Sequence, residues 1–225
     1  MSKDVPSPDD GSRLLKAVEA IAIKPADAKH MVAQYRHKSE QQNPNDSNSQ
    51  HQKRVAKKIV KRYAKIASAV GGTTALTGII PGIGTAAAMV GGAATDATVG
   101  MKLQVDMCMC LAEAFDYDLN SEDAKHLSFL IAAGGTLEQA GVETAVQIGS
   151  KAGVKVLKEQ LKGASLIAVK EAFKKIGITF TRKSLEKAIP FGIGVVLGSS
   201  ANYGLTRYVG KQATEWFVID AAGKG

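Results

Sequence analysis

Two long stretches without a charged residue constrain the fold of this chain more than any other feature. Residues 66–95 are thirty consecutive uncharged positions, and residues 188–206 form a second uncharged run. Each run contains a proline, Pro81 or Pro190, followed closely by Gly-Ile-Gly. A membrane-spanning helix needs about 20 apolar residues. Pro and Gly near the middle of the first run instead favour two short arms around a turn, and neither arm is long enough to cross a bilayer.

We therefore expect each run to form an apolar hairpin of small residues. Gly and Ala at this density allow helices to approach closely, in lipid or in a protein core. The sequence leaves both environments open: an interfacial or re-entrant hairpin in a membrane, or a buried hairpin in a soluble bundle. The predicted turn residues are Pro81, Gly82, Gly84, Pro190, Gly192, Gly194 and Gly198.

The net charge of +8 is the remainder of separate charged blocks. Residues 51–65 carry seven basic and no acidic side chains, residues 96–150 sum to −7, and residues 151–187 sum to +7. A basic surplus favours nucleic acid or anionic membrane as a partner. If the acidic block neutralises the second basic block, the free cationic feature is the first one.

That first block is predicted to be a basic amphipathic helix. Its Lys and Arg residues form two adjacent i,i+4 rows, whereas Val55, Ile59 and Tyr63 line another face. Such a helix fits an anionic surface, either lipid headgroups or phosphates. The alternative is a solvated face whose apolar stripe packs on the domain. The candidate membrane-surface or anion-binding residues are Lys53, Arg54, Lys57, Lys58, Lys61, Arg62 and Lys65.

We predict an all-α fold, a helical bundle that includes the two apolar segments. Residues 1–52 are expected to hold two short helices (13–23 and 26–36) and a disordered linker over the polar residues 39–52, outside the main domain 53–218. Residues 219–225 are expected to be a flexible C-terminus. The N-terminal residues show no apolar run after a basic start, so no secretory signal is expected.

Within the main domain, residues 99–111 are predicted to be helical, with Lys102 and Asp106 paired at i,i+4. The stretch from Asn120 to Asp123 is predicted to be the cap of a helix over 122–133, which Gly134 and Gly135 would end. Residues 177–181 are expected to form a turn or a short extended piece.

No catalytic or metal site can be assembled from the sequence. Cys108 and Cys110 point in different directions on a helix, so we expect buried, inert thiols. The G-x-G-x-x-A match at residues 82–87 follows a proline and has no parallel sheet around it. We expect no enzyme activity, catalytic residue, metal or cofactor. Stacking aromatics are absent from the basic segment apart from Tyr63, which disfavours nucleic acid as a partner.

The chain resembles the EcsC family. The resemblance lies in the Gly-rich segment that runs into Asp96 and the following helix, in the Phe-Asp-Tyr-Asp turn at 115–118, and in the C-terminal segment from Pro190 to Phe217. A YcjF-type membrane domain shares the Gly-rich hairpin and is a related possibility. The family-signature polar residues are Asp96, Lys102, Asp106, Tyr117 and Asn202. The resemblance implies a helical, membrane-associated protein and supplies no catalytic residues.

Together these patterns predict a non-enzymatic protein on the cytoplasmic side of a membrane, peripheral or partly inserted. Its expected partners are anionic lipids and a membrane protein complex, in a membrane transport or envelope process. The alternative is a soluble helical adaptor or a carrier of a lipid or other hydrophobic ligand. The oligomeric state stays open.

Overall fold

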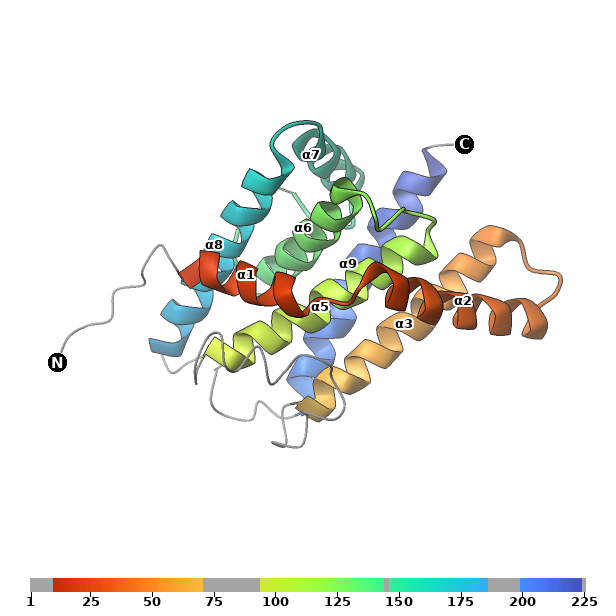
Figure 1. Cartoon of the computed structure of the whole chain (residues 1–225), viewed down its shortest axis with the longest axis horizontal. Coiled ribbons are helices and arrows are strands. Elements are labelled where there is room, and N and C mark those ends of the chain that lie inside the picture. Colours follow the sequence, from red (N-terminus) through yellow and green to blue (C-terminus); the bar gives the residue numbers. More distant parts are fainter. Residues whose placement is uncertain (1–9, 71–93, 144–145, 186–198, 224–225) are drawn as a thin grey trace.

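The central element of the structure is a helix whose side chains are buried on every side. The computed structural model describes residues 10–70, 94–143, 146–185 and 199–223, and throughout this part of the chain the fold is all-α, as predicted (Figure 1). The central helix is α5 (Ala94–Ala114). From Ala97 to Ala112 every residue except Gly100 is buried. A helix that is buried on every side belongs to the core of the protein.

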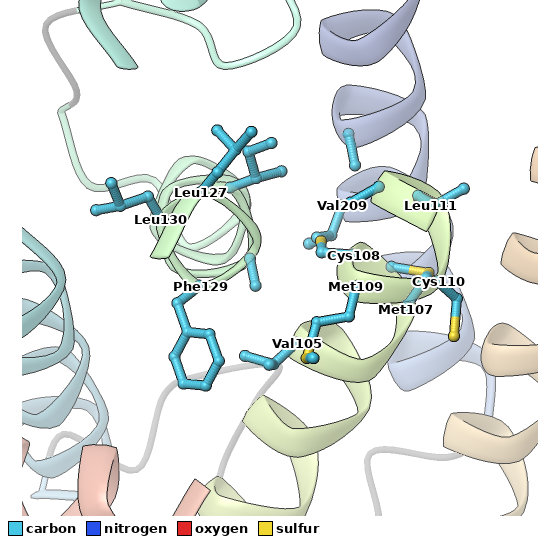
Figure 2. Close-up of a cluster of buried hydrophobic side chains, with 14 of the residues drawn as sticks. Val105, Met107, Cys108, Met109, Cys110, Leu111, Leu127, Phe129, Leu130 and Val209 are labelled. Atoms are coloured by element: carbon cyan, nitrogen blue, oxygen red, sulfur yellow. The ribbon is translucent and has the colours of Figure 1, made fainter. Parts of the chain in front are cut away.

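Other helices cover α5 on all sides. It packs against α1 (Asp10–Ile21), α2 (Pro25–Gln42), α3 (Asn48–Val70), α6 (Glu122–Gln139) and α9 (Ser199–Ala222). Figure 2 shows the contact with α6, where Phe129 lies beside Val105 of α5. The remaining helices, α7 (Lys151–Lys162) and α8 (Ser165–Leu185), pack against α6.

Local signals in the sequence set several helix ends. The Ser121 side chain accepts a hydrogen bond from the Ala124 amide and begins α6, as predicted. Ser150 caps α7 in the same way through the Gly153 amide. At the end of α5, Asp116 takes a left-handed backbone conformation with φ of 64°, which Asp tolerates better than most residues.

The predicted linker over residues 39–52 is corrected by the structure. Residues 39–42 belong to α2 and residues 48–52 to α3. Ser39 and His51 are buried and hydrogen-bond across the α2–α3 connection, with 3.0 Å between Oγ and Nδ1. Gln52 donates to Asp116 Oδ2 at 2.8 Å. Polar side chains that find buried partners therefore order a segment whose composition is typical of disorder.

Three further expectations are corrected. Gly134 and Gly135 do not end α6, which continues to Gln139; they lie against Ile148 and Val209, where larger side chains would collide or crowd. Residues 177–181 are part of α8 rather than a turn or extended piece. Residues 219–222 continue α9 instead of beginning a flexible terminus, and Asp220 is buried.

The helices α3 and α9 come into close contact in the core at Gly210. A Cβ atom at this position would lie 2.7 Å from both methyl groups of Val60 and 3.1 Å from the Met107 sulfur. Gly204, on the same helix, has nothing within 4 Å of the corresponding position. The two glycines thus differ in packing while they share the backbone cost of glycine in a helix.

We predict that Gly210→Ala lowers the free energy of unfolding by about 1–3 kcal/mol through overpacking. Gly204→Ala, the matched control, should raise it by about 0.5–1 kcal/mol because alanine costs less backbone entropy in a helix. Urea unfolding followed by circular dichroism measures both. Equal effects of the two substitutions would contradict the close contact at Gly210.

Candidate functional site

The basic residues of α3 form an exposed surface, which we call the α3 basic face. Its members are Lys53, Arg54, Lys57, Lys58, Lys61, Arg62 and Lys65, all exposed except Lys58, which is half-buried. On the opposite side of the helix Val55, Ala56, Ile59 and Tyr63 are buried. From Lys53 to Lys65 the face extends about 18 Å along the helix axis, at about 1.5 Å per residue.

Few carboxylates neutralise the α3 basic face. Arg54 pairs with Asp46 at the α2–α3 connection. Among the residues that the structure describes, none of the other six has an ion-pair partner. A row of unneutralised cationic side chains produces a local positive potential that attracts anionic surfaces.

The apolar half of α3 faces inward. It packs against α9, α5 and α2, and the Tyr63 hydroxyl lies 3.6 Å from the Cys110 sulfur in the core. This burial raises the pKa of the Tyr63 hydroxyl well above its ordinary value. What α3 offers to a partner is therefore its charge.

Lys102 and Asp106 form an ion pair inside the bundle, as the sequence predicted. Their side chains are 4% and 6% exposed, and Asp106 Oδ1 also accepts a hydrogen bond from the Ile23 amide at 2.8 Å. Burial raises the pKa of Asp106, and Lys102 and the Ile23 amide oppose this shift. The pair ties the α1–α2 connection to the centre of α5.

Tyr117 belongs to a second polar network that sequence reasoning missed. Its hydroxyl donates to Asp220 Oδ2, and Lys158 of α7 pairs with Asp220 Oδ1. The Tyr117 ring packs edge-on against Phe217, with the ring centres 5.2 Å apart. The signal for Asp220 was the spacing of buried α9 residues, which continues past Phe217 to this carboxylate. The pKa of Tyr117 is raised by burial and by Asp220.

The five family-signature residues do not converge on one site. Lys102 and Asp106 pair with each other, whereas Tyr117 binds Asp220 in the other network. Asn202 is half-buried on α9. Asp96 belongs to α5, but its side chain is outside the described residues, as are the predicted turn residues Pro81, Gly82, Gly84, Pro190, Gly192, Gly194 and Gly198.

Cys108 and Cys110 are buried in the core, as predicted, and point in different directions from α5 (Figure 2). Burial raises the pKa of the Cys108 thiol, and it raises that of Cys110 to about 12. In the described part of the chain, no group of three or more His, Cys, Asp or Glu residues is placed to hold a metal ion. None of the helices found in that part is long and apolar enough to span a bilayer.

A model of the EcsC protein family matches residues 13–218, which confirms the resemblance seen in the sequence. The match begins at residue 13 instead of residue 53, so α1 and α2 belong to the family region together with the rest of the bundle. Neither the curated proteins nor the solved structures gave a significant match.

We predict that removing one partner of the Lys102–Asp106 pair lowers the free energy of unfolding by about 3–5 kcal/mol, because it leaves an uncompensated buried charge. The variants are Lys102→Met and Asp106→Asn, of which the second retains an acceptor oxygen for the Ile23 amide. The double variant should be more stable than additivity predicts, by about 1–3 kcal/mol. Additive losses in urea unfolding would show that the two charges are not coupled.

The thiols give a second expectation. A thiol reagent at pH 8 should react with Cys108 and Cys110 only as fast as the core opens, because the raised pKa and burial withhold the thiolate. In denaturant both thiols should react at the rate of a free cysteine. Rapid reaction of the folded chain, measured by absorbance, would contradict the buried position of α5.

Proposed function

The chain belongs to the EcsC family, and from this premise we propose that it is a non-enzymatic protein of the cytoplasmic membrane surface. It binds anionic lipid headgroups through the α3 basic face, which acts as the polar side of a basic amphipathic helix. It serves as an accessory component of a membrane transport or envelope process, with a membrane protein complex as a further partner.

The observation that carries this proposal is the exposure of the α3 basic face without neutralising carboxylates. Six of its seven residues are exposed, and of the seven only Arg54 has an ion pair among the described residues. Each Lys or Arg near an anionic leaflet contributes about 1 kcal/mol to binding. Three or four side chains that reach the headgroups together therefore support reversible binding.

The binding is electrostatic in origin, because the apolar half of α3 already stabilises the bundle. Salt screens exposed charges over a distance of about 10 Å at 0.1 M. Affinity for anionic vesicles should therefore fall as the salt concentration rises. A soluble adaptor with the same fold would show no such preference for anionic lipid.

The positions of four helix ends suggest which edge of the bundle faces the membrane. The two uncharged runs connect α3 to α5 and α8 to α9 in sequence. The ends of α3 and α8 and the beginnings of α5 and α9 all lie toward the lower edge of Figure 1. In our proposal this edge faces the membrane, and residues 71–93 and 188–198, the parts of the two runs that lie outside the described residues, contact the acyl boundary.

We predict that Lys57→Glu/Lys61→Glu weakens partitioning onto phosphatidylserine-containing vesicles by at least about tenfold, since it removes two attractive charges and adds two repulsive ones. Co-sedimentation at low salt measures the bound fraction. Both side chains are exposed, so the fold should be unchanged by circular dichroism.

The matched control is Lys38→Glu/Lys211→Glu, which changes the net charge equally at exposed positions on α2 and α9. It should bind within about twofold of the unmodified chain if the α3 face is the contact. Equal losses in the two variants would assign binding to net charge alone. Failure of the unmodified chain to sediment with anionic vesicles at low salt would refute the proposal.

A further inference from the structure

The helix α9 carries an exposed arginine, Arg207, next to the α3 basic face. Among the residues that the structure describes, Arg207 has no ion-pair partner. The α3 segment contains no acid, and α9 contains two. Of these two, Glu215 pairs with Lys211, and Asp220 is buried and pairs with Lys158. The helices that meet here therefore supply no carboxylate that neutralises Arg207.

The contact between Gly210 and Val60 fixes the level of each residue along the two helices. The helices pack against each other, and α3 ends toward the lower edge of Figure 1, where α9 begins, so they run antiparallel. At 1.5 Å per residue, Arg207 lies about 4.5 Å from Gly210 toward that edge. Lys61 and Lys65 lie about 1.5 and 7.5 Å from Val60 in the same direction. The level of Arg207 is therefore between those of the two lysines.

These cationic residues also lie on the same side of the contact between the helices. On α3 the residues three before and one after the contact position are exposed, Lys57 and Lys61. On α9 the residues at the same offsets, Arg207 and Lys211, are exposed as well. In two antiparallel right-handed helices, equal offsets from the contact position point to the same side. Lys65, four residues after Lys61, continues this row.

A tyrosine and a glycine of α9 shape the space around Arg207. The guanidinium carbon lies 6.0 Å from the centre of the Tyr203 ring, an arrangement that cation–π attraction favours. Gly204 is exposed, three residues before Arg207, and nothing lies within 4 Å of the position that its Cβ atom would take. The ring thus restrains the guanidinium, and the open space lets a ligand approach it.

The chemistry of this group of cations selects its ligand. A guanidinium donates two parallel hydrogen bonds to two oxygens of one phosphate, which an ammonium group cannot do. A phosphate monoester has three terminal oxygens and carries about −1.5 to −2 charges at pH 7, whereas a phosphodiester has two and carries a single charge. Three unneutralised cations from two helices therefore favour the monoester. A second copy of the chain would oppose cation to cation, which is unfavourable.

We infer that Lys61, Lys65 and Arg207 form a binding site for a lipid whose headgroup is a phosphate monoester, and we call it the α3–α9 site. Arg207 binds two phosphate oxygens, and the two lysines supply the remaining positive charge. The inference rests on the proposed function, because it takes a lipid of the same anionic leaflet as its ligand. It adds a preference among anionic lipids to the general attraction of the α3 basic face.

The test compares two kinds of vesicle that have the same zeta potential, one containing phosphatidate and the other phosphatidylserine. Equal surface potential removes the general electrostatic attraction from the comparison. The full chain should bind the phosphatidate vesicles about tenfold more tightly, because hydrogen bonds to a charged group add to the attraction. Co-sedimentation over a range of lipid concentrations measures both affinities.

Three variants at exposed positions of α9 separate the hydrogen bonds of Arg207 from its charge. Arg207→Gln should reduce the preference for phosphatidate to within about twofold. Arg207→Lys keeps the charge, so it should retain the affinity for phosphatidylserine vesicles and lose most of the preference. Lys211→Gln is the matched control: it removes one charge on the same side of α9, from a residue that pairs with Glu215, and should keep the preference. Circular dichroism checks that all three variants are folded.

The outcomes separate the α3–α9 site from the proposed function. Equal affinity of the unmodified chain for the two kinds of vesicle, or an unchanged preference in Arg207→Gln, would overturn the site and leave the α3 contact standing. Loss of the preference in Lys211→Gln as well would assign it to net charge and also overturn the site. Release from phosphatidate vesicles by an equal concentration of glycerol 3-phosphate would assign the site to a soluble phosphate. No binding to either kind of vesicle would overturn both proposals.

Discussion

The burial of α5 on all sides is the constraint on which the rest of the structure depends. A helix surrounded by protein has no solvent-facing side, so its charged residues must find partners inside. Lys102 and Asp106 form an ion pair with each other, and the remaining Asp106 oxygen accepts a hydrogen bond from the Ile23 amide. This hydrogen bond places the connection between α1 and α2 over α5. The N-terminal helices are therefore part of the bundle, and the family match from residue 13 agrees with this arrangement.

The functional proposal also depends on which side of a helix the bundle buries. The apolar half of α3 packs on α9 and α5, and that leaves its basic half to the exterior. The acidic residues of the neighbouring block do not neutralise it: Asp106 pairs with Lys102, Asp116 with Arg36 and Glu122 with Lys125. The positive charge of α3 stays unneutralised because these carboxylates pair with other residues. The net charge of the chain does not reveal this.

Sequence patterns predicted the features that depend on near neighbours. The α6 cap at Ser121, the i,i+4 pair of Lys102 and Asp106, and the buried thiols of α5 all follow from local spacing. Features that depend on distant partners were missed. Ser39 and His51 order the α2–α3 connection only because each meets the other in a buried position, and Asp220 is fixed by Lys158 and Tyr117, far away in the chain. The glycines of α6 resembled a helix end because composition does not reveal a close neighbour such as Ile148.

Fractionation of cells that express the full chain tests the central claim most directly. Our account predicts that the chain sediments with membranes at low salt and is released, wholly or in large part, by a high-salt wash. Recovery of the chain in the soluble fraction at low salt, with membranes intact, would contradict the account.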